Sequence, residues 1–228
     1  MTRAEAAPAT QSRREAGKAR RRARIVAAAA ALVREAGFEA VSMLDIAARA
    51  EVSPATLYNL FATKGAIFRE VFDQDLTRFT ARVSEAPAED GVDRIFVALE
   101  IAAGLYRRNP KFYRAMMHLG DVEPLNASIS EPRRRFWEDC VAAAVSAGEL
   151  RAGVDARVVG GLLNQIVRGH LLDWAAGTIS VDRLAKESAY GFAVVLSAFA
   201  ASAAAGGLHT RMEDLEKALA GMSGARRK

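Results

Sequence analysis

Apolar residues recur at helical spacing along most of the chain, and turn-forming residues separate the periodic segments. The first apolar set runs from Ile25 to Val33 at intervals of three and four residues, which predicts a helix that begins near Arg20. Gly37 follows it, at a place where a left-handed residue commonly ends a helix. No stretch shows the sustained alternation of β-branched and polar residues that predicts a strand. The pattern therefore predicts an all-α fold.

Two short segments come next, and both carry signals for a helix start. The stretch SMLD is a capping-box pattern, in which the Ser42 hydroxyl accepts a backbone N–H and Asp45 reaches back. In the stretch VSPATLYNLF, Ser53 is expected at the N-cap and Pro54 at the first helical position. The apolar residues of this second segment share one helical face, which leaves its small and polar residues on the outside.

A longer helix is expected after Thr63, and a larger helical body follows it. The apolar set of the longer helix runs from Ile67 to Val83. Proline and glycine separate six further helical segments, near residues 91–108, 111–120, 132–147, 155–176, 181–204 and 211–221. The chain is thus expected to have a disordered basic arm at 1–18, a small domain at 19–79 and a larger helical domain at 80–228.

Charge is distributed unevenly between these parts. Residues 1–64 hold 11 Lys and Arg against 6 Asp and Glu, whereas the remainder holds 21 of each sign. A basic N-terminal part on a neutral body suggests a polyanionic partner for the first part only. A basic surface that simply faces water remains the alternative on charge alone.

Two short helices joined by a tight turn are typical of a helix-turn-helix, whose second helix enters the major groove of double-stranded DNA by its N-terminal residues. Ala55 permits close approach to a base, and Thr56 offers a hydroxyl and a methyl group. Tyr58 and Lys64 are placed to reach phosphates. Spacing alone leaves a second interpretation open, a plain helical hairpin with a capped second helix.

The stretch GFEAVSMLDIAARAEVSPATLYNLFATKGAIFREVF at residues 37–72, with the helix before it, resembles the DNA-binding domain of the TetR family of bacterial transcriptional regulators. The resemblance covers about residues 19–79, through G-F, S-x-x-D-I-A, V-S-x-x-T-L-Y-x-x-F and the lysine after it. It implies that some residues of this domain contact DNA phosphates, that others read bases, and that others clamp the DNA backbone. The DNA-binding residues expected on this basis are Arg22, Arg24, Ser42, Ser53, Pro54, Ala55, Thr56, Tyr58, Asn59 and Lys64.

Two positions depart from the family pattern. Leu44 stands where many members have an arginine, so one phosphate contact is expected to be missing. Glu51 replaces the common turn glycine, and it must either accept a strained backbone or change the turn. Asn59 and Leu60 occupy positions that vary in the family, so the operator sequence does not follow from the resemblance.

The resemblance also implies that the larger domain is helical, binds a small-molecule effector and forms a homodimer. The segments 155–176 and 181–204 are apolar nearly all round, and a helix of that kind needs partners on two sides. We therefore expect these two helices to form a four-helix interface between two subunits, with Gly160 and Gly161 permitting close backbone approach. Burial of both helices within one subunit is the alternative.

Aromatic and sulfur side chains with a few polar interruptions suggest a largely apolar effector cavity in the larger domain. The candidate lining residues are Phe96, Glu100, Tyr106, Tyr113, Met116, Met117, His118, Trp137, Asn164 and Arg168. The alternative is ordinary core, because aromatic and Met residues at helical spacing are more often core than ligand contacts.

Nothing in the sequence favours an enzyme, a cofactor or a metal site. The three histidines lie far apart, and no Gly-rich phosphate loop or nucleophile elbow occurs. Cys140 is the single cysteine, which fits a reducing cytoplasm and is expected to be an inert buried thiol. The longest stretch of low polarity is too short and too rich in small residues to span a membrane, so a soluble cytoplasmic protein is expected.

The preferred interpretation is a dimeric repressor that a small molecule releases from a pseudo-palindromic operator. Three alternatives remain: a ligand-independent architectural DNA-binding protein, a transcriptional activator, and an enzyme that uses the helical body.

Overall fold

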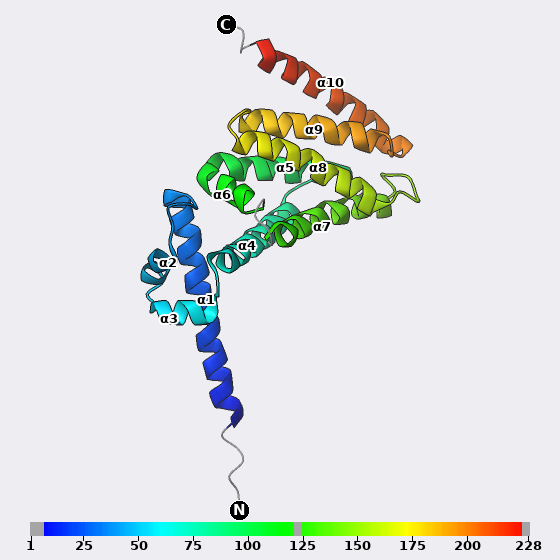
Figure 1. Cartoon of the computed structure of the whole chain (residues 1–228). Coiled ribbons are helices and arrows are strands. Elements are labelled where there is room, and N and C mark those ends of the chain that lie inside the picture. Colours follow the sequence, from blue (N-terminus) through cyan, green and yellow to red (C-terminus); the bar gives the residue numbers. More distant parts are fainter. Residues whose placement is uncertain (1–6, 121–124, 225–228) are drawn as a thin grey trace, which may run out of the picture. The chain divides into compact units, whose positions relative to one another are not determined.

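The computed structural model describes residues 7–120 and 125–224, and these residues form ten α-helices (Figure 1). The predicted all-α class is confirmed. Within the described ranges, the β-type pairing is limited to an isolated antiparallel bridge between Leu150 and Ala200. The chain divides into two compact units, Met1–Gln74 and Asp75–Lys228. The division falls inside one helix, a few residues before the domain boundary expected from the sequence.

The first unit holds a long helix followed by two short ones and the beginning of a fourth. These are α1 (Ala7–Ala36), α2 (Met43–Arg49), α3 (Pro54–Leu60) and α4 (Lys64–Glu85), which continues into the second unit. Their apolar faces meet in one core, which contains Ile25, Val26, Ala29, Val33, Ile46, Ala47, Leu57, Phe61, Ile67, Phe68 and Val71. Leu57 and Phe61 are buried as the spacing predicts, and Leu60 is half-buried.

Helix α1 begins earlier than the sequence analysis predicted. Residues 7–18, expected to belong to a disordered arm, are helical, whereas residues 1–6 lie outside the described part of the chain. Alanine, arginine, lysine, glutamate and glutamine dominate this stretch, and all of them have high helix propensity. The extension could not be found from apolar periodicity, which begins only at Ile25. Residues 13–21 are almost all exposed, so this part of the helix has no buried apolar face to mark it.

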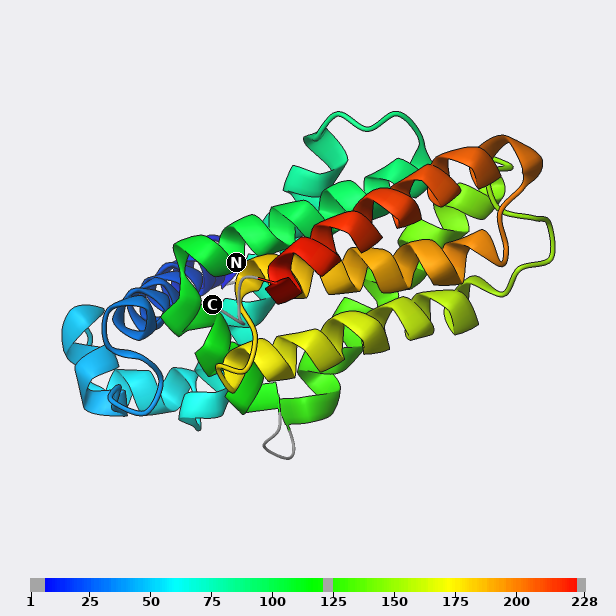
Figure 2. The ribbon, with the colours of Figure 1, turned by 90° about the horizontal axis from the view of Figure 1, so that it is seen from above.

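The second unit is a helical body. It contains α5 (Gly91–Arg108), α6 (Pro110–Gly120), α7 (Leu125–Ser146), α8 (Ala156–Ala175), α9 (Val181–Ser197) and α10 (Ser202–Gly224). Helix α7 packs on α8, α8 on α9 and α9 on α10, while α5 contacts both α7 and α9. Figure 2 shows α8, α9 and α10 running side by side. The core between these helices includes Ile95, Leu99, Phe112, Met116, Val141, Leu163, Leu171 and Phe192.

Three predicted boundaries in this body were wrong. Helix α7 begins at Leu125 and passes through Pro132, which was the predicted start. The predicted helix at 181–204 breaks after Ser197, and its last residues belong to α10, which also contains the predicted separate helix at 211–221. The Arg151 N–H donates to the Phe199 carbonyl over 2.8 Å, and the Ala201 N–H donates to the Glu149 carbonyl over 2.8 Å. The break therefore pairs with the loop between α7 and α8, which the apolar period does not reveal.

The two adjacent glycines of α8 have different surroundings. A β-carbon added at Gly160 would lie 2.6 Å from the Cα and N atoms of Glu138, whereas one added at Gly161 would meet nothing within 4 Å. The close approach expected at Gly160 is therefore made to α7 of the same chain. It fixes α8 against the turn of α7 that contains Trp137 and Glu138.

Candidate functional site

The start of α2 is held by the predicted capping box. The Asp45 N–H donates to Ser42 Oγ over 3.1 Å, and the Ser42 N–H donates to Asp45 Oδ2 over 2.9 Å. The Ser42 hydroxyl also donates to Asp45 Oδ2 over 2.6 Å. These bonds hold the pKa of the Asp45 carboxyl below its usual value of 3.8, because hydrogen bonds from Ser42 favour the ionised form. Ser42 is exposed, but its hydroxyl already serves the cap.

The turn between α2 and α3 contains Glu51 in the left-handed region, with φ at 51°. Residues other than glycine adopt this backbone conformation at a cost of about 1–2 kcal/mol. Hydrogen bonds from the Glu51 N–H to the Ala48 carbonyl and from the Val52 N–H to the Ala47 carbonyl close the turn. The Arg24 guanidinium donates to the Glu51 carbonyl over 3.3 Å. The strained backbone expected at Glu51 is confirmed, and Arg24 supports the turn.

The start of α3 is capped as predicted, and its outer face is open. Ser53 Oγ accepts a hydrogen bond from the Thr56 N–H over 3.1 Å and lies 2.8 Å from the Thr56 hydroxyl. Pro54 occupies the first helical position. The Tyr58 side chain is 52% exposed, while Leu57 on the opposite face is fully buried. The predicted base-reading face therefore points away from the core of the unit. Its exposed residues are Ser53, Pro54, Ala55, Tyr58 and Asn59, and Thr56 is half-buried at its edge.

Arg22, predicted to contact phosphate, makes its contacts with other residues of the first unit. Its guanidinium pairs with the Glu70 carboxylate at 2.6 Å, donates to the Leu60 carbonyl over 3.0 Å and lies over the Phe61 ring at 4.1 Å. These three contacts tie α1 to the end of α3 and to α4. The geometry favours a positioning role for Arg22, because its donors are aimed at the protein.

Lys64 makes a similar internal connection. Its Nζ donates to the Phe38 carbonyl over 2.6 Å and lies 3.8 Å from the centroid of the Phe38 ring. Burial lowers the pKa of Lys64, and the nearby Glu39 opposes that shift. An ammonium has three donors, so one can hold Phe38 while the others face outward.

The N-terminal part of α1 supplies basic residues, and those up to Lys18 were expected in a disordered arm. Arg13, Arg14, Lys18, Arg20 and Arg21 are exposed on the helix. Their excess positive charge was visible in the sequence, but the helical arrangement of Arg13, Arg14 and Lys18 was not. A rigid helix that carries these charges offers phosphate contacts at fixed spacing.

Several predicted effector residues are brought together in the second unit. The Tyr106 ring lies 4.9 Å from the Tyr113 ring and stacks on Trp174 at 5.6 Å, and the Tyr113 hydroxyl donates to Asp75 over 2.9 Å. Met116 and Met117 are buried beside them in α6. The side chain of His118, another candidate, lies outside the part of the chain whose side chains are described.

Arg133 of α7 belongs to the same region and was missed in the sequence. Its Nη1 lies 3.9 Å from the Met117 sulfur. Burial lowers the pKa of Arg133; the Tyr106 hydroxyl opposes that shift, and the nearby Arg168 cation adds to it. Tyr106, Arg133 and Arg168 are therefore close enough to interact electrostatically. The available sequence signal was the spacing of four residues between Arg133 and Trp137, which puts both on one face of a helix.

Two buried polar atoms in this body are left without a hydrogen-bond partner among the described residues. They are Nε1 of Trp137, which is 3% exposed as a residue, and Oδ1 of Asn164, which is 4% exposed. An unsatisfied buried donor or acceptor costs about 1–3 kcal/mol. Each of these two atoms is therefore a candidate contact for a bound molecule.

Two other candidates lie elsewhere. Glu100 is exposed and lines an open pocket of about 600 Å³ together with Arg82, Ile101, Gly104 and Arg108. Phe96 is buried under the Arg211 guanidinium, whose carbon lies 4.1 Å from the ring centroid. Phe96 thus packs as core, and Glu100 faces a surface depression.

The described residues hold one arrangement that resembles catalytic chemistry. His170 Nδ1 lies 2.9 Å from the Ser188 hydroxyl, and its Nε2 lies 3.7 Å from the Glu187 carboxylate. Ser188 is fully buried, so a substrate cannot reach its hydroxyl. Burial also raises the pKa of the Cys140 thiol to about 12, which keeps it protonated and unreactive at neutral pH.

Residues 7–120 and 125–224 contain neither a metal-binding cluster nor a membrane-spanning helix. No group of three or more His, Cys, Asp or Glu side chains there is arranged to hold a metal ion. None of the helices in those ranges is both long enough and apolar enough to cross a bilayer.

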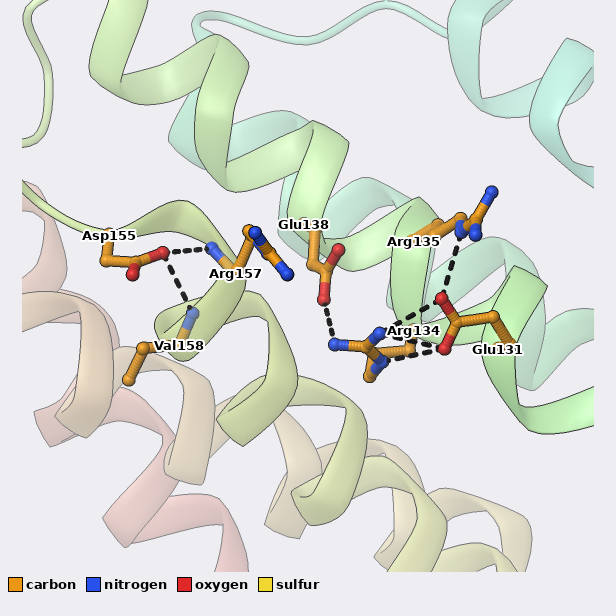
Figure 3. Close-up of polar contacts among 7 residues, drawn as sticks. All are labelled: Glu131, Arg134, Arg135, Glu138, Asp155, Arg157 and Val158. Carbon is orange, nitrogen blue, oxygen red and sulfur yellow. Dashed lines mark hydrogen bonds and ion pairs between the residues drawn. The ribbon is translucent and has the colours of Figure 1, made fainter. Parts of the chain in front are cut away.

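Helices α8 and α9 each leave large apolar side chains exposed. Val158 is 59% exposed, Leu162 is 46% exposed and Val194 is 45% exposed. Val158 and Leu162 are one turn apart on α8, so they form a stripe on one face. Close to Val158, the start of α8 is capped by Asp155, whose Oδ1 accepts from the backbone N–H of Arg157 and of Val158 (Figure 3).

Comparison with known proteins agrees with this geometry. Residues 25–71 match the model of bacterial regulatory proteins of the tetR family. The chain is 31% identical over 96 residues to the HTH-type transcriptional repressor KstR of Rhodococcus jostii strain RHA1, a match that covers 42% of this chain and 45% of KstR. The aligned part therefore spans less than half the length of that relative.

Solved structures share the fold over most of the chain. A TetR transcriptional regulator from Rhodococcus sp. RHA1 superposes with a TM-score of 0.67 at 22% identity, covering 79% of this chain and 97% of that one. Thermus thermophilus FadR, a TetR-family repressor in complex with lauroyl-CoA, gives 0.65 at 23% identity, with 77% and 93% covered. Residues 25–71 are thus similar to bacterial regulatory proteins of the tetR family, and the chain shares the fold of solved TetR-family regulators.

Proposed function

We propose that the protein is a dimeric transcriptional repressor that binds a pseudo-palindromic DNA operator and is released from it by a small molecule. The observation that carries this proposal is the open outer face of α3. Its small and polar residues are exposed, while Leu57 and Phe61 fix the opposite face in the core. A short helix held in this way is suited to entering a major groove.

The residues proposed to read bases are Ala55, Thr56 and Asn59. Each well-formed base contact discriminates by about 1–3 kcal/mol. Ser42, Tyr58 and Lys64 are proposed to contact the DNA backbone, while Ser42 also caps its own helix and Lys64 also holds the Phe38 carbonyl after α1. The exposed arginines and lysine of α1 add salt-dependent affinity that does not depend on sequence.

The proposed dimer uses α8 and α9. Its support is that Val158 and Leu162 on one face of α8, and Val194 on α9, are large apolar side chains left exposed, and exposed apolar patches often mark association surfaces. A two-fold dimer presents two recognition helices, and half-sites then lie about 34–36 Å apart along B-DNA. The DNA sequence is expected to share that two-fold symmetry.

The proposed effector binds in the second unit near Tyr106, Tyr113 and Trp137. Helix α4 contains residues of both units, so it is the natural element through which effector binding alters DNA binding. A coupling free energy of about 1–3 kcal/mol suffices for release. The structural neighbour FadR of Thermus thermophilus holds lauroyl-CoA, an apolar chain with a polar head. An effector with a large apolar part is the corresponding proposal for this chain.

The test is a binding titration with DNA from the promoter nearest the protein's own gene. Saturable binding that exceeds binding to shuffled DNA by at least about 1000-fold is expected at physiological salt. Thr56→Ala should reduce this ratio, whereas Lys18→Met should weaken binding to both DNAs alike. Equal affinity for both DNAs would favour an architectural DNA-binding protein instead.

A further inference from the structure

The N-terminal part of α1 carries a row of basic residues along one side. Arg13, Gly17, Arg20 and Arg24 follow one another at intervals of four, three and four residues, so they share one face of the helix. We call these four residues the arginine stripe. Its three arginines are exposed. At a rise of about 1.5 Å per residue, the stripe is about 16 Å long.

The opposite side of this part of α1 has different chemistry. Glu15, the one acidic residue between positions 7 and 24, lies about 200° round the helix from Arg13. Arg22 lies about 180° from Arg13, and its guanidinium pairs with Glu70 of the same unit. Arg13 and Arg20, by contrast, form no ion pair with another described residue. The stripe therefore presents its positive charge to whatever lies outside the protein.

The arginine stripe ends at the turn that precedes α3. Arg24 Nη2 donates to the Glu51 carbonyl over 3.3 Å, and Arg24 Nη1 lies 4.0 Å from the Glu51 carboxylate. Glu51 comes two residues before Ser53, the N-cap of α3. All of these residues belong to the first unit, in which α1 continues past α3 (Figure 1). The stripe thus leads away from the end of α3 that is proposed to enter the groove.

Gly17 leaves the middle of the stripe open. Glycine is unfavourable inside a helix, but here it keeps a side chain out of the space between Arg13 and Arg20. A β-carbon added at Gly17 would lie 3.6 Å from Nη1 of Arg21, which leans back along the helix to this position. An anionic group can therefore approach the helix backbone between three guanidinium groups.

The chemistry of the stripe fits DNA better than a membrane surface. Residues 13–24 include no large apolar side chain, whereas a helix that lies on a membrane needs an apolar face. Double-stranded DNA carries one phosphate charge per about 1.7 Å of its axis, so a stripe of about 16 Å matches about five base pairs. The contact of Arg24 with the turn before α3 favours DNA over an acidic protein as the polyanion.

We propose that the arginine stripe binds the phosphate backbone of the DNA that flanks the half-site read by α3. This inference rests on the proposed function and extends it, because each subunit then holds about five base pairs beyond those that its recognition helix reads. Arg13 and Arg20 make the contacts. The exposed cations on another face of α1, among them Arg14 and Lys18, contribute only long-range attraction.

The first test measures how the affinity of the full-length protein for a mixed-sequence duplex of about 40 base pairs depends on salt. Each phosphate contact contributes about 0.9 to the slope of log K against log salt concentration. Arg13→Gln combined with Arg20→Gln should lower the slope by about 1.8 per subunit. Arg14→Gln combined with Lys18→Gln removes the same charge from the other face and should lower it by less than about half as much. Equal losses in the two double variants would overturn the inference.

A second pair of variants separates geometry from charge. Gly17→Leu fills the middle of the stripe without changing any charge, and it should weaken binding to the same duplex about tenfold. Ala19→Leu is the matched control, at an exposed position about 120° from the stripe, and it should leave the affinity unchanged. Leucine is a good helix former, so neither variant should lower the melting temperature. Unchanged binding by Gly17→Leu would contradict the proposed contact.

The third test locates the contact on DNA. Removing about five base pairs outside each half-site of a bound promoter duplex should weaken the wild type about tenfold or more, and should not affect the Arg13→Gln, Arg20→Gln double variant. Equal wild-type affinity for the trimmed and full duplexes would overturn the inference. So would binding to vesicles of about one-third phosphatidylglycerol that this double variant weakens as much as duplex binding.

These outcomes are separate from those that test the proposed function. Loss of the preference for promoter DNA over shuffled DNA counts against a sequence-reading repressor. It leaves the comparison of salt slopes standing, because phosphate contacts do not depend on the base sequence. Sequence preference with equal salt slopes in the two double variants would instead support the repressor and refute the role of the arginine stripe.

Discussion

Lys64 at the start of α4 donates a hydrogen bond of 2.6 Å to the carbonyl oxygen of Phe38, just after α1, and its ammonium lies over the ring of the same residue. The bond satisfies a carbonyl in the turn that leads to α2. The ring of Phe38 in turn packs edge-on against Phe68 of α4, with centroids 5.0 Å apart. One side chain thus fastens the two ends of the segment that contains the helix-turn-helix.

Replacing Lys64 with methionine should therefore destabilise the first unit as well as weaken DNA binding. We expect a loss of about 1–2 kcal/mol in the free energy of unfolding, from a charge-assisted hydrogen bond and a cation–π contact at a half-buried site. Urea denaturation measures the loss. Lys18→Met removes the same charge from an exposed position, and an equal effect of the two variants would disprove the structural role.

Replacing Glu51 with glycine should make the protein more stable. Glu51→Gly relieves the positive φ and should stabilise the protein by about 1 kcal/mol. Glu51→Gln keeps the strained backbone and removes only the charge, so it should raise DNA affinity with little change in stability. Thermal unfolding and a DNA titration separate the two effects. Stabilisation of the same size by glutamine would show that charge, and not backbone strain, is the cost at this turn.

The two neighbouring glycines of α8 offer a matched pair for the second unit. Gly160→Ala places a methyl group against the Glu138 backbone and should cost about 2 kcal/mol or more. Gly161→Ala meets open space and should stabilise the helix by about 0.5–1 kcal/mol. Chemical denaturation of both variants tests this difference. If neither substitution lowered the free energy of unfolding, α7 and α8 could not be in the tight contact described at Gly160.

The capping box at α2 predicts an acid-dependent contribution to stability. The folded-state pKa of Asp45 lies below its ordinary value of 3.8, so its contribution is fully present above that value and disappears as the pH falls through the folded pKa. Carbon-detected NMR should find the Asp45 carboxyl titrating below 3.8. In Ser42→Ala the pKa should rise toward 3.8. Titration of wild-type Asp45 at or above the ordinary value would contradict the capping geometry.

The sequence predicted the first unit in detail because its signals are local. The N-caps at Ser42 and Ser53, the left-handed Gly37 and the buried Leu57 each depend on residues within one or two turns. The start of α7 at Leu125 was missed because Pro132, which lies inside the helix, was predicted to be its start, and the break after Ser197 was missed because it depends on a distant partner. The second of these reflects pairing with the loop near Glu149, which no helical period can reveal.

Side-chain roles were harder to predict than positions. Arg22 and Lys64 occupy positions expected to contact phosphates. In the structure, however, Arg22 binds Glu70 and the Leu60 carbonyl, and Lys64 binds the Phe38 carbonyl. Periodicity shows which face of a helix a charge occupies but not which distant group it meets.

The central claim is that the outer face of α3 reads DNA sequence as one half of a two-fold pair. The direct measurement is selection of bound sequences from a random double-stranded DNA pool by the wild-type protein and by Asn59→Ala. We predict that the wild type enriches a pseudo-palindrome with half-sites about 10 base pairs apart, or a multiple of that distance. Asn59→Ala should lose information at the same position in each half. Absence of an enriched sequence, or a motif that Asn59→Ala, Ala55→Ser and Thr56→Ala all leave unchanged, would contradict the account.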